Sequence, residues 1–428
     1  MSSRIGVGIV GVGRRAYDLA QCMARLRNEI NIEVRALHNR TRSRAERVKD
    51  EISKSYEATG AVPKIRIHDS QESLVADDDV ELVMICTPQY AHREPAVLAL
   101  QAGKRVYVDK PLAHNLEDAL AIYREQEKGK NPIIMSFTRR FEGPWITAYD
   151  LLKTEEAIGT LRMILVRNVI PYHTYFHTWH RRVEWSGGAI GDKMSHIFDV
   201  FNWYSGASPL RVSAFGGQAV FGPREDAPER CSLCTIECPY RVAGYVGEQE
   251  TTKTSSQKEQ KRDRPDAMVD FDESRLSESE IIKRHDTCVW YPGADINDHG
   301  LVNIEYDSGL KASLFWTLFG PDSDDQETME LVGDKGRAIL TRHEGSIDLV
   351  TDYGKSHRNI DARKETFEQS HFGADDNFIR ELDAFCKGAP ASVTAKEGLM
   401  ASRMVEAAHR SIKNGGSLVE MSSVEGEG

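Results

Sequence analysis

Short apolar runs alternate with helical stretches through the first third of the chain, from Arg4 to Ser136. The runs are apolar at nearly every position, as in strands that helices cover on both faces, whereas a half-exposed antiparallel strand would alternate. This rhythm predicts an α/β fold whose amino-terminal part is a Rossmann-type, doubly wound parallel sheet. The predicted strands are Ile5 to Val10, Ile32 to His38, Glu81 to Cys86, Arg105 to Val108 and Pro132 to Met135.

The pattern changes beyond Phe137 to helix-like segments and strand pairs joined by turns. We therefore predict a dinucleotide-binding domain over residues 1–137 and an α+β domain for substrate binding and oligomerisation over residues 138–428. The second domain is expected to hold an open, mainly antiparallel sheet, with helices on one face and a subunit interface on the other. Its predicted strands include Leu310 to Phe319, Glu327 to Val332 and Arg337 to Thr341.

Two further segments of the second domain stand out, one by its polar composition and one by its helical periodicity. Residues 244–279 are polar and poor in large apolar side chains, so their burial would not repay the entropy of ordering them. We expect a mobile insert there. Helical periodicity over residues 374–413 predicts two closing helices, from Ala374 to Lys387 and from Ala395 to Lys413.

Composition narrows the range of partners. The chain has 428 residues, is 40% apolar and carries a formal net charge of −11. Because it has no basic stripe, nucleic acid is not an expected partner. Its longest apolar runs fall far short of the roughly 20 residues needed to span a bilayer, so no membrane association is expected. No apolar stretch follows a basic amino terminus, and we expect a cytoplasmic protein.

A G-x-G-x-x-A motif begins at Gly11, directly after the first predicted strand and at the start of a helix. Gly11 permits a tight turn, Gly13 lets the backbone approach a pyrophosphate, and Ala16 allows the helix to pack closely. The helix start at Arg14 and Arg15 offers free N–H groups to phosphates. The alternative, a glycine-rich turn without a ligand, is less favoured because strand, motif and helix occur together.

The end of the second predicted strand bears on the choice of cofactor. An NAD enzyme usually places Asp or Glu there to bind the ribose 2′-hydroxyl, but this chain has Asn39. Arg40 and Arg42 could pair with a 2′-phosphate. This favours NADP, with NAD still possible. Alternatively, the two arginines only begin a solvated helix, which would leave the cofactor open.

Two loops follow later strands of the predicted parallel sheet. Thr87, Pro88 and His92 come after the strand ending at Cys86, and Asp109 and Lys110 come after the strand ending at Val108. Ligands of doubly wound sheets bind beyond these carboxyl ends, so Lys110 is expected to face the nicotinamide. A Lys-Pro pair that is only part of a loop is the alternative.

In the second half of the chain, Asp192 and His196 lie four residues apart after a Gly-Gly stretch. On a helix they share one face. The imidazole can exchange protons near neutral pH, and the carboxylate can orient it or bind a substrate hydroxyl. A helix-capping Asp and a core His are the alternative.

In this order the motifs resemble the Gfo/Idh/MocA family of oxidoreductases, typified by glucose-fructose oxidoreductase and inositol dehydrogenases, over nearly the whole chain. The resemblance implies NAD(P)-linked oxidation of a sugar or cyclitol hydroxyl, with Lys110 and His196 in proton transfer and Asp192 binding the substrate. It rests on the glycine turn, Thr87-Pro88 with His92, Lys110-Pro111, Arg140-Phe141, the Gly-Gly stretch with Asp192 and His196, and Ser392 to Ala395.

The chain departs from this family at two positions. Asp109 stands where the family usually has Glu, which shortens a contact on the cofactor side. Lys193 and Met194 occupy a stretch where many members have a glycine. Lys193 therefore places an additional cation beside the expected pocket, and the division of labour between Lys110 and His196 stays open.

A loop between these motifs, from Tyr172 to Trp185, concentrates aromatic, imidazole and hydroxyl groups. Sugars suit such surfaces because rings cover C–H faces while polar tips hold hydroxyls. An interface or structural loop is the alternative. The candidate substrate residues are Arg140, His173, Trp179, His180 and Lys193.

Four of the seven cysteines form a separate pattern. Cys231, Cys234 and Cys238 give C-x2-C-x3-C, and Cys288 follows beyond the polar insert. Three thiolates this close, with Cys288 or His285 as the fourth ligand, predict a structural zinc site. An iron–sulfur cluster and unligated thiols are the alternatives.

Three functions are compatible with these residues. The first is an NAD(P)-dependent oxidoreductase that transfers a hydride between nicotinamide and a hydroxyl or keto carbon of a small-molecule sugar or polyol, working as a homo-oligomer (dimer or tetramer). The second is an enzyme that cleaves glycosides by transient oxidation. The third is a regulatory protein that binds the cofactor without turnover.

Overall fold

The computed structural model describes residues 4–60, 62–129, 131–231, 234–241, 286–364 and 367–424. The polar insert predicted over residues 244–279 and His285 lie outside these ranges. Within them, no helix is both long and apolar enough to cross a membrane. The cellular compartment stays a prediction.

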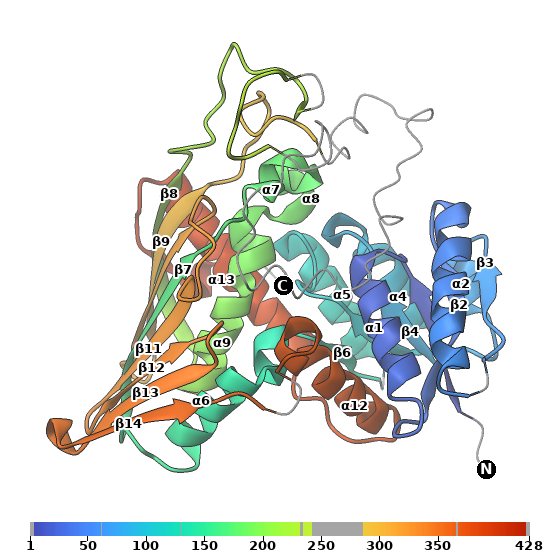
Figure 1. The fold of residues 1–428 in the computed structure, drawn as a ribbon, viewed down its shortest axis with the longest axis horizontal. Coiled ribbons are helices and arrows are strands. Elements are labelled where there is room, and N and C mark those ends of the chain that lie inside the picture. The colour runs from blue at the N-terminus through green and yellow to red at the C-terminus, as the bar shows by residue number, and fades with distance from the viewer. Residues whose placement is uncertain are drawn as a thin grey trace.

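The first sheet is parallel throughout and has the strand order β3-β2-β1-β4-β5-β6 (Figure 1). This confirms the predicted doubly wound sheet. The additional strand β3 has only three half-buried residues at the sheet edge, and therefore no apolar run marks it. The boundary predicted at residue 137 falls just after β6 and stays a prediction. The strands are β1 (Ile5–Val10), β2 (Ile32–His38), β3 (Arg66–His68), β4 (Leu82–Ile85), β5 (Arg105–Val108) and β6 (Ile133–Met135).

Helices cover both faces of this sheet, as the apolar strands require. Side chains cap two of them, because the Ser70 hydroxyl accepts from the Ser73 N–H and the Asn115 side chain accepts from the Asp118 N–H. Each cap satisfies one free N–H of a first turn. The helices are α1 (Arg14–Arg25), α2 (Arg42–Glu57), α3 (Gln71–Val75), α4 (Arg93–Gln101) and α5 (Leu116–Lys128).

The second sheet has nine strands in the order β14-β13-β12-β11-β7-β10-β9-β8-β15. It is mainly antiparallel, as predicted, but β7 and β10 pair in parallel. The strands are β7 (Leu161–Val169), β8 (Pro209–Gly217), β9 (His299–Tyr306), β10 (Lys311–Thr317), β11 (Glu327–Gly333), β12 (Arg337–Thr341), β13 (Ser346–Thr351), β14 (Ser356–Asp361) and β15 (Val419–Glu420).

The two faces of the nine-stranded sheet differ. Helices α6 (Gly143–Lys153) and α9 (Ser195–Ser205) lie on the side that faces the first sheet, and the other side is open (Figure 1). On the open side Phe215, Leu301 and Phe315 lie in register across β8, β9 and β10. Their exposed fractions are 54%, 37% and 47%. The open face therefore carries an apolar stripe.

The closing helices tie the two sheets together. Helix α12 (Ala374–Cys386) buries Phe378 in the core of the first sheet. Helix α13 (Ala395–Lys413) contributes Leu399 to the same core and Met404 to the core of the second sheet. One helix thus packs in both cores, and this sets how the two sheets face each other.

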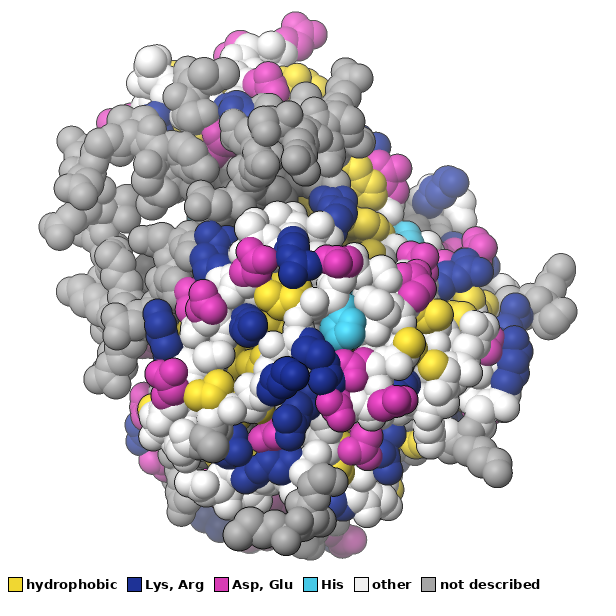
Figure 2. All heavy atoms as spheres, turned by 90° about the vertical axis from the view of Figure 1, so that its right-hand side faces the viewer, with side chains coloured by type: hydrophobic (Ala, Val, Ile, Leu, Met, Phe, Trp, Pro, Cys, Tyr) yellow, Lys and Arg dark blue, Asp and Glu magenta, His cyan; other side chains and the backbone are white. Residues whose placement is uncertain are grey.

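Charge on the outer face of the first sheet is mixed. Figure 2 shows Lys and Arg side chains gathered beside acidic ones on this side. Arg42 pairs with Glu46, and Arg66 pairs with Asp77 at 2.6 Å and with Asp79. The charges of these two arginines are thus compensated by neighbouring carboxylates.

Candidate functional site

The glycine turn has the geometry of a phosphate-binding loop. Gly11 has a φ of +86°, and a Cβ there would lie 2.7 Å from the Thr87 backbone nitrogen. At Gly13 a Cβ would meet only the Cys86 carbonyl, at 4.0 Å. Helix α1 starts without a capping side chain or an acidic residue in its first turn. Its first N–H groups therefore have no capping side chain and can donate to a diphosphate.

The arginines of the glycine turn point in different directions. Arg14 is exposed and lies 3.7 Å from Asp18. Arg15 is turned inward, where it pairs with Asp375 of α12 and lies 3.5 Å from Asp109. We conclude that the Arg15 side chain connects the turn to a closing helix, so its predicted contact with a cofactor would have to come from its backbone N–H.

The loop after β2 holds the residues predicted to select the cofactor. The Asn39 side-chain oxygen accepts from the Val12 N–H at 3.2 Å, which braces the glycine turn. Arg42 pairs with Glu46 and with Asp69 on the surface. Arg40 is exposed, and no side chain in the described part of the chain bonds to its guanidinium. Arg40 is therefore the cation of this loop that remains available to bind a phosphate group.

His92 connects the two loops that follow β4 and β5. Its imidazole is buried, with Nε2 2.9 Å from the Thr87 oxygen and Nδ1 3.0 Å from the Pro111 oxygen. Burial lowers its pKa and favours the neutral ring. The structure thus places His92 behind the crevice, where it holds Lys110 and Thr87 in position. Asp109 accepts from the Tyr107 hydroxyl at 2.7 Å.

Lys110 and Asp192 meet where the two sheets face each other. The Lys110 Nζ lies 2.9 Å from Asp192 Oδ1 and 3.0 Å from the Asp192 carbonyl oxygen. Gln89 and Tyr175 also donate to the Asp192 carboxylate. Burial alone would raise the pKa of Asp192, but the charges of Lys110 and His180 and the hydrogen bonds from Tyr175 and Lys110 together outweigh it and hold that pKa well below its usual value. The carboxylate is therefore charged.

Asp192 does not lie on an ordinary helix. It belongs to a π-helical turn, Ile190–Met194, which leads into α9. Such turns insert one extra residue into the backbone ladder and often occur at functional sites. The sequence predicted Asp192 and His196 on one face of a regular helix, and the structure differs because the first of them lies in the π-helical turn.

His196 follows this turn at the start of α9. Its ring is 7% exposed and packs edge-on against Phe137, with 5.8 Å between ring centroids. Burial, then the nearby charges of Lys110 and Arg139, lowers its pKa well below the usual value. Its Nδ1 is buried and has no hydrogen-bond partner among the residues that the structure describes. A neutral ring with an unused nitrogen can accept a hydrogen bond from a hydroxyl.

Lys193 lies beside this group and contacts Tyr172. Its Nζ is 3.3 Å from the Tyr172 hydroxyl and 4.5 Å from the centre of that ring. It is also 4.0 Å from Glu327. The Lys193 charge lowers the pKa of Tyr172. The additional cation predicted from the sequence therefore has a phenol and a carboxylate as neighbours.

Beneath these residues lies a buried network of four charges, which sequence reasoning missed. Arg139 lies 2.8 Å from Glu142 and 2.6 Å from Glu327, and Arg342 pairs with both carboxylates. All four side chains are at most 8% exposed. The partners are up to 200 residues apart in the chain, so no spacing in the sequence indicates the network.

The aromatic loop reaches the site at one end. Trp179 stacks on His180 at 3.9 Å between centroids, and His180 stacks on Tyr175, which bonds to Asp192. His173 instead lies beside His177, and burial lowers its pKa to about 4. The structure thus connects Trp179 and His180 to the site, but not His173.

Arg140 is engaged elsewhere. Its guanidinium makes two bonds to Asp199, at 2.7 and 2.8 Å, and donates to the Ser392 carbonyl at 3.1 Å. It also lies over the Trp203 ring. These contacts join α9 to the closing segment. No contact with Lys110 or Asp192 is found for Arg140 in the described part of the chain.

The cysteine residues do not support the zinc prediction. In the described ranges, which include all four thiols, no group of three or more Cys, His, Asp or Glu side chains is arranged to hold a metal. The Cys231 sulfur faces His177 Nδ1 at 3.9 Å. Arg241 donates to the carbonyl oxygens of Cys231 and Cys234. An arginine thus braces the backbone of this loop. The described residues therefore do not support the metal site predicted at Cys231, Cys234, Cys238 and Cys288.

Two family models match the chain. The oxidoreductase family NAD-binding Rossmann fold matches residues 5–137, and the oxidoreductase family C-terminal alpha/beta domain matches residues 154–421. An uncharacterized oxidoreductase of Synechocystis is 26% identical over 243 residues, which is 56% of this chain. Inositol 2-dehydrogenase of Corynebacterium glutamicum is 30% identical over 216 residues, which is 50% of this chain. The chain spans 57% of each relative.

Solved structures share the fold over the whole length. An NAD-binding oxidoreductase from Klebsiella pneumoniae has a TM-score of 0.73, with 15% identity over 98% of this chain and 99% of that one. Levoglucosan dehydrogenase in complex with NADH and levoglucosan has a TM-score of 0.72 at the same identity and coverage. Because the two family models together match most of the chain and follow the order of its two sheets, this protein belongs to the Gfo/Idh/MocA oxidoreductase family.

Proposed function

We propose that the protein is an NADP-dependent dehydrogenase or reductase that acts on a secondary hydroxyl, or the matching ketone, of a sugar, sugar derivative or cyclitol. One observation carries the proposal. The Lys110 ammonium, in the loop after β5, lies 2.9 Å from the charged carboxylate of Asp192 in the turn before α9, and the Nδ1 of His196 has no hydrogen-bond partner among the described residues. The names of relatives, inositol 2-dehydrogenase and levoglucosan dehydrogenase, support the substrate class.

Each residue of the site has a separate role in the proposed reaction. When bound, the nicotinamide would take up or return the hydride. Lys110 and His196 move the hydroxyl proton, and the neutral His196 ring accepts a hydrogen bond from that hydroxyl. Asp192 holds Lys110 in place and accepts a hydrogen bond from a second substrate hydroxyl. Trp179 and His180 cover the C–H face of the ring and exclude water.

A substrate screen tests the proposal. Sugars and cyclitols, levoglucosan and myo-inositol among them, would be supplied with NADP⁺, and nicotinamide absorbance would be followed. At least one should reduce the cofactor in a 1:1 ratio with ketone formed. Released sugar without net cofactor reduction would indicate transient oxidation, and no turnover with any compound would contradict the proposal.

The NADP preference rests on Arg40. Replacing it with Ala is expected to weaken NADPH binding by about tenfold, because one charge-assisted bond to the 2′-phosphate is lost. NADH binding should change little. Fluorescence titration of both cofactors measures this, with Arg93→Ala as the control because that exposed arginine pairs with Asp118 away from the glycine turn. Equal losses of affinity for NADPH and NADH would contradict a contact between Arg40 and the 2′-phosphate.

We propose a homo-oligomer that uses the open face of the nine-stranded sheet. The stripe of Phe215, Leu301 and Phe315 supports it, since exposed apolar patches of this kind mark interfaces. Phe315→Asp is expected to shift the protein to a smaller species in analytical ultracentrifugation. Tyr353→Asp is the control, because Tyr353 is 88% exposed but lies on the hairpin beyond β13. An unchanged mass for Phe315→Asp would contradict the interface.

A further inference from the structure

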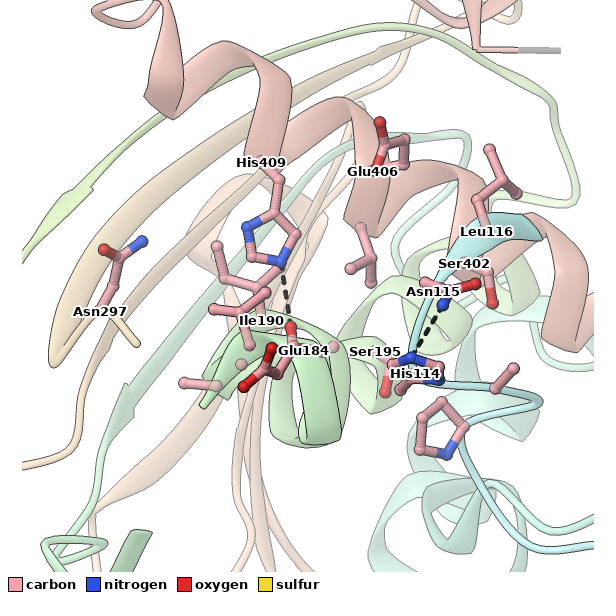
Figure 3. A pocket seen from close by; sticks show the side chains of 18 of the residues that line it. His114, Asn115, Leu116, Glu184, Ile190, Ser195, Asn297, Ser402, Glu406 and His409 are labelled. Carbon is pink, nitrogen blue, oxygen red and sulfur yellow. Dashed lines mark hydrogen bonds between the residues drawn. The ribbon is translucent and has the colours of Figure 1, made fainter. Parts of the chain in front are cut away.

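A cavity lies behind the turn that carries Asp192. Its volume is about 530 Å³, within the usual range for small-molecule sites of roughly 300–1,000 Å³. Its walls come from the loop before α5, the Gly187–Gly191 segment, the loop before β9 and one side of α13 (Figure 3). Lys110, Asp192 and His196 are not among its lining residues. The cavity is thus distinct from the candidate catalytic group.

Two polar groups in the wall have unused hydrogen-bonding capacity. The Asn297 amide has no hydrogen-bond partner among the described residues. His409 Nε2 lies 3.0 Å from the Gly187 carbonyl, which can only accept, so Nε2 donates (Figure 3). Burial lowers the pKa of His409 and keeps the ring neutral. Its Nδ1 is therefore an acceptor, and together with the amide it can bind hydroxyl groups.

The charged side chains around the cavity are mostly neutralised. Glu184 and Asp295 both lie near Arg182, at 3.0 and 3.7 Å. Glu406 pairs at 2.7 Å with the arginine four residues further along α13. Lys413 is the remaining charged lining residue, and it is exposed at the end of that helix. The cavity therefore favours an uncharged molecule, because an ion would gain no buried counter-charge.

Apolar side chains supply the rest of the wall, with Leu116, Ile190 and Val405 among them. We propose that this cavity is a second ligand site, for a neutral hydroxylated ring compound of monosaccharide or disaccharide size. The C–H faces of the ring pack on the apolar side chains, and its hydroxyls bond to Asn297 and to His409 Nδ1.

The site shares a wall with the candidate catalytic group. The Ser195 hydroxyl, which lines the cavity, donates to the Asp192 carbonyl at 3.4 Å. The same carbonyl accepts from Lys110 Nζ at 3.0 Å. The Ser195 hydroxyl and this shared carbonyl thus connect the wall of the cavity to Lys110.

Calorimetric titration of the full chain, saturated with NADPH, tests the proposal with glucose, myo-inositol and sucrose as probes. At least one probe should show binding that Lys110→Ala retains and that Asn297→Leu weakens by about tenfold, since the latter removes the free amide. Ile412→Trp, which fills the cavity from α13, should weaken it likewise. Asn359→Leu, at an exposed position of β14, is the matched control and should bind as the wild type does.

Two results would overturn the proposal. One is that no probe shows binding that survives in Lys110→Ala, so that all binding belongs to the catalytic group. The other is that Asn297→Leu and Ile412→Trp both bind as tightly as the wild type while remaining folded. Failure of the substrate screen would affect neither result, because the titration needs no turnover.

Discussion

Replacing Lys110 with Ala is expected to lower kcat by about 10²- to 10⁴-fold, the usual contribution of a positioned acid–base group. In the structure the Lys110 ammonium contacts the side chain and carbonyl of Asp192. The substitution therefore removes a proton-transfer group, and it also leaves the Asp192 carboxylate without its ammonium partner. The cofactor Kd should change little, because the glycine turn and the α1 N-terminus are untouched.

Steady-state kinetics on the substrate found in the screen, together with cofactor titration, measure this. Lys128→Ala is the matched control, since Lys128 also pairs with a carboxylate in the first domain but is 71% exposed. Full activity of Lys110→Ala would show that another group moves the proton. Loss of cofactor binding in step with kcat would point to a structural effect instead.

Replacing Glu327 with Gln is expected to lower the free energy of unfolding by about 3–5 kcal/mol, because it leaves buried arginines without part of their counter-charge. Glu327 bonds to Arg139 at 2.6 Å and pairs with Arg342, and all three side chains are at most 8% exposed. Urea denaturation followed by circular dichroism measures the loss. Glu330→Gln is the control on the same strand. Its partly exposed pair with Arg337, at 3.3 Å, should contribute only about 0.2–1 kcal/mol.

The difference in the free energy of unfolding between wild type and Glu327→Gln should depend on pH with a definite sign. Burial would raise the pKa of Glu327, but Arg139 and Arg342 outweigh it and hold that pKa well below its ordinary value of 4.5. A carboxyl with a depressed pKa stabilises the fold fully above its unfolded-state pKa. That contribution is lost as the pH falls below about 4.5 toward the folded-state pKa. The difference between wild type and Glu327→Gln should therefore shrink in acid. A constant difference from pH 7 to pH 3 would contradict the charge argument.

Local signals in the sequence were enough to predict five of the six strands of the first sheet. Strand β1 is a six-residue apolar run followed directly by the Gly11 turn, and both are read within one short stretch of chain. Strand β3 was missed because its three residues are only half-buried at the edge. The π-helical turn at Asp192 was also missed, since a single inserted residue leaves the helical periodicity almost unchanged.

The two-sheet architecture, the phosphate-binding turn and the residue types of the candidate site could be predicted from the sequence, because strand burial, turn geometry and helix starts depend on neighbouring residues. Which side chains contact one another could be seen only in the folded chain. His92 and Arg140 make structural contacts, Glu327 bonds to Arg139 across 188 residues, and the described residues show no metal-binding group at the thiols. The physical reason is that such contacts depend on how α13 packs the two sheets against each other, which no local pattern encodes.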